Sequence, residues 1–143
     1  IQHWGSPRVV SRGHLHQADE LPGLLAEAAG SPAGLLLYHV QAGQCEVVVL
    51  QADPPGRGAG AQLLAAARAQ ARQLGCVRLW LITTNDNEPA QRFYARNGMR
   101  PAAVHRGAVA AARRLKPEIP LLGLGGRPIE DEVEFEYVLT GGP

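Results

Sequence analysis

The feature that most constrains the fold of this chain is a strand that leads through a glycine-rich turn directly into a helix. An apolar strand is predicted over 46–51, and an alanine- and leucine-rich segment typical of a helix starts at about Gly58. Such a helix leaves its first backbone N–H groups unpaired, and its dipole places partial positive charge at the same point. The junction therefore predicts a binding site for a phosphate or a pyrophosphate.

Two well-known glycine-rich loops do not fit this junction. A Walker loop needs Lys and then Ser or Thr after its last glycine, but Ala61 and Gln62 follow Gly60. A dinucleotide-binding loop has the spacing G-x-G-x-x-G near the start of a βαβ chain, whereas the glycines here are spaced G-x-G-x-G from Gly56 onward. An ordinary tight turn before a helix remains one interpretation.

Another interpretation rests on two segments that occur at a characteristic separation. The first is Pro55-x-x-Gly58-x-Gly60, and the second, over 87–99, is N-x-x-A-x-x-F-Y-x-x-x-G-M. Together they resemble the acyl-CoA loop and a later helix of the GCN5-related N-acetyltransferase (GNAT) family, whose loop is usually [Q/R]-x-x-G-x-[G/A]. Pro55 stands in place of Gln or Arg. The resemblance covers roughly 35–139 and is more specific than either motif alone.

The resemblance implies an α/β (α+β) fold with a mixed, mostly antiparallel sheet, a central parallel crossover and flanking helices. The family's sheet splays open at the acyl-CoA site. Hydrophobic periodicity indicates a matching order of elements: strands at 23–27, 35–41 and 45–51 with a turn at 30–32, a helix at 58–74, a strand at 77–84, a short helix ending at Gly98, a strand at 99–105, a helix at 108–115 and a strand at 132–139.

The resemblance also implies that acetyl-CoA is the cosubstrate and that an amine accepts its acetyl group directly. Backbone N–H groups of the loop would hold the pyrophosphate, from Gly56, Arg57, Gly58, Ala59, Gly60 and Ala61. The main chain of the preceding strand would bind the pantetheine amides, at Val48, Val49 and Leu50. Asn87 matches a residue that contacts the cofactor arm, and it also suits the N-cap of the short helix.

Two residues are implied to be catalytic. Tyr94 matches the tyrosine that protonates the leaving thiolate, because a phenol of pKa ~10 can donate to a thiolate of pKa ~8.5; packing beside Phe93 is the alternative. Glu46 lies where several relatives place the base for the ammonium, and the alternative is a solvated charge at the outer end of a strand. His39 and His105 are further strand residues that could face the cleft. Three alternating glutamates are interpreted as a solvated strand face: Glu132, Glu134 and Glu136.

Composition excludes several other classes of protein. The chain has 14 basic and 13 acidic residues and a net charge of +1, so no nucleic-acid partner is expected. It has no apolar run near the ~18 residues of a membrane span and no recognisable signal peptide, so we predict a cytoplasmic protein. Cys45 and Cys76 fit neither a disulfide framework nor a metal site and are interpreted as buried thiols. His14 and His16 are interpreted as an exposed pair, and no metal is expected.

Two other functions remain open at this point. A non-catalytic acetyl-CoA or CoA sensor, or a partner subunit of the same fold, is favoured by Pro55 and by the absence of the family's usual front end. A nucleotide-binding regulatory domain is a weaker interpretation. The acceptor of an active enzyme would be a small-molecule or peptide amine.

The first residues bear on the domain organisation. We predict a single domain over 1–143 that lacks the family's first strand and most of its first helix. Apolar surface beside 36–38 would then lack cover. We therefore expect either about 20 residues upstream of Ile1, at typical element lengths, or a second copy of the chain that covers this surface in a homodimer.

Overall fold

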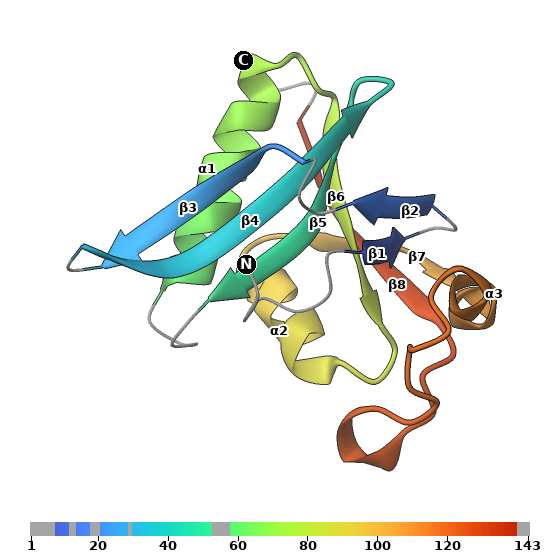
Figure 1. Ribbon diagram of the computed structural model, residues 1–143. Coiled ribbons are helices and arrows are strands. Elements are labelled where there is room, and N and C mark those ends of the chain that lie inside the picture. The colour runs from blue at the N-terminus through green and yellow to red at the C-terminus, as the bar shows by residue number, and fades with distance from the viewer. Residues whose placement is uncertain (1–7, 12–13, 18–20, 29, 53–57, 140–143) are drawn as a thin grey trace.

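The computed structural model describes residues 8–11, 14–17, 21–28, 30–52 and 58–139 (Figure 1). In the described residues, six strands form one sheet in the order β3-β4-β5-β6-β8-β7, and β1 pairs with β2 in a separate ribbon. The elements are β1 Arg8–Ser11, β2 His14–Gln17, β3 Gly23–Ala28, β4 Ser31–Gln41, β5 Gln44–Ala52, α1 Ala59–Gln73, β6 Arg78–Thr84, α2 Glu88–Arg96, β7 Arg100–His105, α3 Ala108–Leu115 and β8 Glu132–Val138. No helix in these ranges is both long and apolar enough to cross a membrane.

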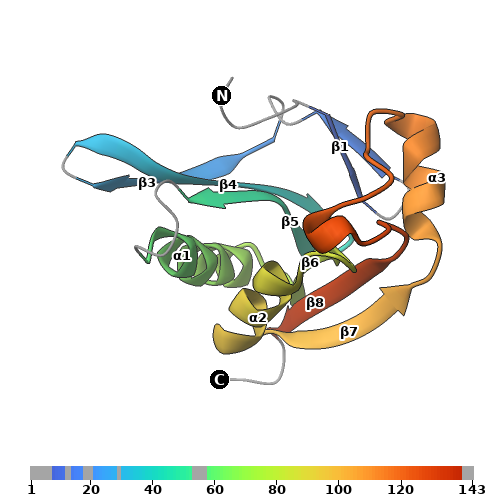
Figure 2. The same cartoon turned by 90° about the horizontal axis from the view of Figure 1, so that it is seen from below.

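The strand directions confirm the predicted mixed sheet. β5 and β6 are parallel and are joined through α1, whereas the other neighbouring strands of the sheet pair antiparallel. Figure 2 shows α1 and α2 on one side of the sheet and β1 on the other. The single parallel crossover matters for the site because α1 is the next described element after β5 in the chain.

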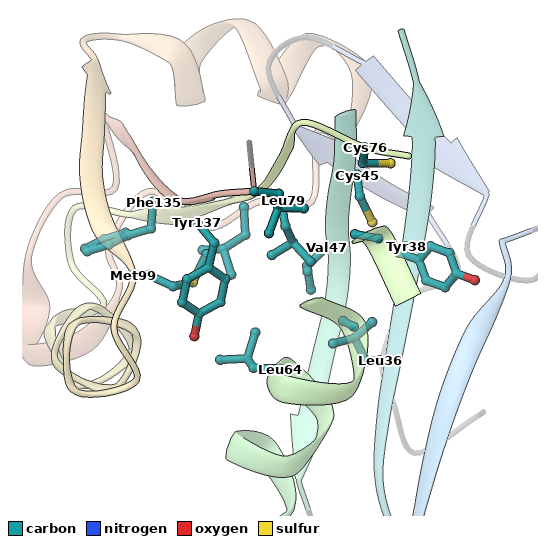
Figure 3. Close-up of a cluster of buried hydrophobic side chains, with 14 of the residues drawn as sticks. Leu36, Tyr38, Cys45, Val47, Leu64, Cys76, Leu79, Met99, Phe135 and Tyr137 are labelled. Atoms are coloured by element: carbon teal, nitrogen blue, oxygen red, sulfur yellow. The ribbon is translucent and has the colours of Figure 1, made fainter. Parts of the chain in front are cut away.

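The core lies between α1 and the sheet. The apolar positions of α1 recur every three to four residues, so Leu63, Leu64, Ala67 and Ala71 form one buried stripe. Figure 3 shows Leu64 of this stripe with buried side chains of β4, β5, β6 and β8. Gly75, with φ 77°, follows the end of α1 and takes the left-handed conformation that commonly terminates a helix.

The apolar residues 36–38 are covered within the chain. Leu36, Leu37 and Tyr38 are 0%, 6% and 8% exposed. They lie on β4, between β3 and β5, and Leu36 and Tyr38 belong to the main core. These three residues are therefore not bare themselves, and the homodimer stays a prediction.

The alternating glutamates of β8 are not a solvated face. Glu132 and Glu134 are buried, and Glu136 is half-buried. β8 lies between β6 and β7, and Arg78 of β6 forms ion pairs with both Glu134 and Glu136. Burial alone would raise the pKa of Glu134, but hydrogen bonds from Arg78 and His105 outweigh it and lower that pKa.

Both cysteines are buried free thiols, as predicted. Burial raises the pKa of Cys45 to about 12 and also raises the pKa of Cys76. At pH 8 only about one Cys45 in 10⁴ is then a thiolate, which is the reactive form. We expect iodoacetamide to leave the mass of the native protein unchanged at pH 8 and to modify both cysteines after denaturation in urea. Modification of the native protein at a rate similar to that of the denatured chain would contradict this.

Candidate active site

β5 and β6 pair over only part of their length. Their parallel pairing covers Gln44 to Val47 on β5 and Arg78 to Leu81 on β6. Beyond these residues β5 continues along β4 as far as Ala52, while β6 continues along β8. The two strands therefore diverge after Val47 and Leu81, and the sheet has the split that the sequence resemblance implied.

A β-bulge lies at the start of this split. Leu37 of β4 pairs with Val49, and the next residue, Tyr38, pairs with Val47. Val48 is thus an extra residue with no partner in the β4–β5 register. A bulge bends its strand and leaves the main chain of the extra residue outside the ladder. The backbone at Val48 to Leu50, where pantetheine contacts were predicted, therefore borders the split.

A pocket of about 520 Å³ extends from the split to the N-terminus of α1. Its volume falls within the roughly 300–1,000 Å³ typical of small-molecule sites. It is lined by the end of β5, the start of α1 and one side of α2: Leu50, Ala52, Gly58, Gly60, Ala61, Pro89, Ala90, Phe93, Tyr94, Arg96 and Asn97. The structure therefore brings the predicted loop and the predicted helix motif to one cavity.

The N-terminus of α1 has the backbone geometry that an anion site requires. Gly58 is the N-cap of α1, with φ 84° and no side-chain hydrogen bond to the helix. The first N–H groups of α1 therefore remain available to bind a ligand. The sequence predicted Gly60 as a point of close ligand approach, and the structure gives it a packing role as well. A Cβ at Gly60 would lie 3.0 Å from Phe93 Cζ, so glycine here lets α2 approach α1. Gly56 and Arg57 lie outside the described residues.

Tyr94 lines the pocket and also packs against the core. Its ring centre lies 5.6 Å from that of Phe93 and 5.7 Å from that of Phe135. Burial raises the pKa of Tyr94 above its usual value of about 10. The phenol therefore keeps its proton throughout the neutral pH range, as a proton donor must, so packing and chemistry are compatible in this residue.

Asn87 is the N-cap of α2. Its Oδ1 accepts a hydrogen bond of 3.2 Å from the Ala90 N–H. It does not line the pocket, whereas Pro89 and Ala90 of the same turn do. The capping interpretation is therefore confirmed, and cofactor contact by Asn87 stays a prediction.

The turn before α2 is held by side chains that bind the loop between α3 and β8. Asn85 Oδ1 accepts hydrogen bonds from the N–H groups of Glu130 and Asp131. Asp86 accepts from the Thr84 hydroxyl and the Leu124 N–H. Burial would raise the pKa of Asp86, but these hydrogen bonds outweigh it and lower that pKa. The network fixes the turn beside the pocket. No local pattern in the sequence indicates these partners, because they lie about 40 positions further along the chain.

Glu46 is not a solvated charge. It is 5% exposed because β5 is a central strand between β4 and β6. In the register Glu46 lies beside His39 of β4 and Trp80 of β6. All three line a second cavity, of about 210 Å³, with Gln41, Ala42 and Gln44. Glu46 also directly precedes Val47, where the split begins. His105 lines neither of these two cavities; its Nε2 lies 2.8 Å from Glu134 Oε1.

Sequence reasoning missed several lining residues of both cavities, notably Arg96, Asn97 and Trp80. The helical period could have found the first two, because residues 89, 93, 96 and 97 share one side of α2. The role of Trp80 depends on the register between β5 and β6, which no local pattern specifies.

Residues 3–99 match the family model described as the acetyltransferase (GNAT) family. The chain belongs to the GNAT acetyltransferase family. It is 38% identical over 139 residues to the uncharacterized protein YdhI of Bacillus subtilis, covering 96% of this chain and 87% of that protein.

Solved GNAT acetyltransferases share the fold. One is a B. subtilis acetyltransferase in complex with CoA, with a TM-score of 0.72, 20% identity and coverage of 85% of this chain and 78% of that one. Another is the ribosomal-protein-S18-alanine N-acetyltransferase of Escherichia coli, with a TM-score of 0.66, 19% identity and coverage of 89% and 74%.

Proposed function

We propose that this GNAT chain is an N-acetyltransferase that transfers the acetyl group of acetyl-CoA directly to an amine. The observation that carries the proposal is the 520 Å³ pocket, which runs from the split between β5 and β6 to the N-terminus of α1. The pocket combines an apolar wall with unpaired N–H groups at one end, as an acyl-CoA requires. A structural relative bound to CoA and another that acetylates a protein amine support the same function.

The residues that hold the cosubstrate follow from this arrangement. The N–H groups at Gly58 to Ala61 are proposed to bind the pyrophosphate. The sequence resemblance alone implies that Gly56 and Arg57 belong to the same cradle. The main chain at Val48 to Leu50 binds the pantetheine amides beside the bulge. Asn87 contributes to the cofactor arm through the amide group that also caps α2.

Two side chains are proposed to act as the general base and the general acid of the acetyl transfer. When bound, acetyl-CoA supplies an acetyl group activated as a thioester. Glu46 accepts a proton from the acceptor's ammonium, so that the nitrogen lone pair is available to form the new C–N bond. Tyr94 donates its proton to the sulfur as the C–S bond breaks. The second proton that the nitrogen loses when the amide forms returns through solvent to the Tyr94 phenolate. General acid and base groups of this kind typically contribute about 10²- to 10⁴-fold each to the rate.

The proposal is tested by calorimetry with acetyl-CoA, CoA and NAD, followed by an unbiased screen of amines for acetylation. Binding of acetyl-CoA together with an acetylated amine is the expected result. Tight CoA binding without any product would favour a non-catalytic sensor, for which Pro55 in place of Gln or Arg is the specific argument. Binding of NAD but not of CoA would contradict both functions.

Arg96 is expected to add a phosphate contact that the loop does not supply. Among the described residues that line the pocket, it carries the one full positive charge, and it lies at the end of α2, apart from Gly58. We expect Arg96 to bind the 3′-phosphate of CoA, because hydrogen bonds to ionised groups are the stronger kind. Arg96→Ala should weaken CoA binding about tenfold and change dephospho-CoA binding by less than about twofold.

Arg92 provides the matched control for this measurement. It is an exposed arginine of the same helix that does not line the pocket, so Arg92→Ala should leave both affinities unchanged. Titration calorimetry with the two ligands gives the comparison. An equal loss for CoA and dephospho-CoA in Arg96→Ala would assign Arg96 to another part of the ligand.

A further inference from the structure

The outer edge of β3 is open in the part of the chain that the structure describes. β3 pairs with β4 on one side and is the first strand of the six-stranded sheet. Figure 1 and Figure 2 show β3 at the margin of the sheet, on the side away from β1. A strand in this position presents unpaired N–H and C=O groups, which readily pair with a strand of another chain.

The register between β3 and β4 determines which backbone groups face outward. Tyr38 donates its N–H to the carbonyl of Pro22 over 3.0 Å, so these two residues form a hydrogen-bonded pair. Pairs with and without hydrogen bonds alternate along an antiparallel ladder. The bulge between these strands does not disturb the alternation along β3, because the extra residue lies on β4. The backbone groups of every second residue of β3 therefore point away from β4: Gly23, Leu25 and Glu27.

The opposite edge of the sheet has features that hinder such pairing. β7 contains Arg100, Pro101 and His105, and its register with β8 shifts after Pro101. Basic residues, prolines and bulges are common means of protecting an edge strand from other chains. β3, with the sequence GLLAEA, contains neither a basic residue nor a proline. The difference makes β3 the edge that is open to pairing.

The side chains of β3 suit pairing with a second copy of the same strand. Leu25 is 55% exposed, whereas Leu24 and Ala26 pack against the core. In an antiparallel pair centred on Leu25, this residue lies opposite its own copy, so the two exposed leucines cover each other. Glu27 then lies opposite Gly23 of the second copy. The two Glu27 residues are four positions apart along the strands, about 13 Å, which exceeds the screening length of ~8 Å at physiological salt.

We propose that two copies of the chain pair through β3, antiparallel and centred on Leu25, and form a homodimer whose two sheets are continuous. Leu25 exchanges two backbone hydrogen bonds with its copy, and Gly23 exchanges two with Glu27 on each side of the axis. A second copy fits this edge because a single register pairs every outward-facing group and keeps the like charges apart. The interface is small, so the dimer is weak and depends on protein concentration.

Sedimentation velocity of the full chain provides the first test. The wild type should change from monomer to dimer between about 1 and 300 µM, the range of weak complexes. Leu25→Pro should remain monomeric over this range, because it removes the outward N–H at the centre of the pair. Proline is tolerated on an edge strand when its N–H side faces solvent, so the pairing with β4 should survive. Leu25→Val keeps the N–H and is the matched control, which should dimerise like the wild type.

A pair of cysteine variants tests the register. Opposite residues of a hydrogen-bonded antiparallel pair have Cα atoms about 5.5 Å apart, which a disulfide can span. Leu25→Cys should therefore form a covalent dimer with oxidised glutathione. Glu27→Cys is the control, since about 13 Å would separate it from its copy, and it should stay monomeric on non-reducing gels. The native Cys45 and Cys76 are buried and should not contribute.

Each result either supports or overturns the dimer. A wild-type chain that stays monomeric at the highest concentration would overturn it, and so would a Leu25→Pro variant that still dimerises. Equal yields of covalent dimer from Leu25→Cys and Glu27→Cys would overturn the register and the interface with it. Circular dichroism shows whether the variants are folded, and if Leu25→Pro is not, the two cysteine variants decide. None of these measurements depends on acetyl transfer.

Discussion

Ala61→Glu is expected to lower acetyl-CoA affinity at least about 100-fold. Ala61 lies in the first turn of α1 and lines the pocket where the pyrophosphate is proposed to bind. A carboxylate there would meet the phosphate charges at contact distance, and like charges about 4 Å apart near a protein surface repel by ~4 kcal/mol. The fold should survive, because an acidic side chain near a helix N-terminus is stabilising.

Gln62→Glu is the matched control for this substitution. Gln62 is the next residue of α1, is exposed and does not line the pocket. The same change in charge at the same end of the helix should alter acetyl-CoA affinity by no more than about threefold. Calorimetry and the ligand-induced rise in melting temperature provide the measurements. If Ala61→Glu kept the full rise in melting temperature, the start of α1 would not be the phosphate site.

Ala61 is preferable to the loop glycines for this test. Gly58 has φ 84°, where any other residue would be strained, and a side chain at Gly60 would collide with Phe93. Substitutions at either glycine would therefore combine loss of binding with damage to the fold. Ala61→Gln separates the effect of side-chain volume from the effect of charge, since glutamine has nearly the same volume as glutamate but is neutral.

The order and type of the main elements could be predicted because they depend on local patterns. The period of two in β8 and of three to four in α1 is visible in the sequence. The period in α1 also predicts Leu74 as part of the buried stripe, but Leu74 lies at the C-cap of the helix and is 50% exposed. Element ends were less accurate. A turn was expected over 30–32, but Gly30, with φ 80°, lies in the turn, and Ser31 already pairs with Ala28.

The candidate site could be predicted only in part. The glycine loop and Tyr94 carry short motifs, so their neighbourhood in space followed from the resemblance. The burial of Glu46 could not be predicted in this way, because it depends on Trp80, which lies 34 positions further along the chain. Trp80 becomes a neighbour of Glu46 only through the parallel register of β5 and β6. The same reasoning explains Glu134, whose partner Arg78 lies 56 positions earlier in the sequence.

Tyr94→Phe is expected to lower kcat about 10²-fold or more, the usual contribution of a general acid. The substitution keeps the ring that packs against Phe93 and Phe135 and removes only the proton donor. The affinity for acetyl-CoA should stay near the wild-type value, since the loss is confined to the transition state. Because burial raises the pKa of Tyr94, the wild-type rate should show no loss from its ionisation below about pH 10.

Tyr137→Phe separates this chemistry from the general effect of deleting a buried hydroxyl. The Tyr137 hydroxyl donates to the backbone carbonyl of Asn97, and its ring lies in the core outside the pocket lining. Loss of the Tyr137 hydroxyl should lower the free energy of unfolding by about 1 kcal/mol and leave kcat within about threefold of wild type. Steady-state kinetics at saturating acetyl-CoA and denaturant titrations of both variants give the comparison. If Tyr94→Phe retained the wild-type kcat while Tyr137→Phe lost only stability, Tyr94 would be a packing residue, and the sulfur would have to take its proton from solvent.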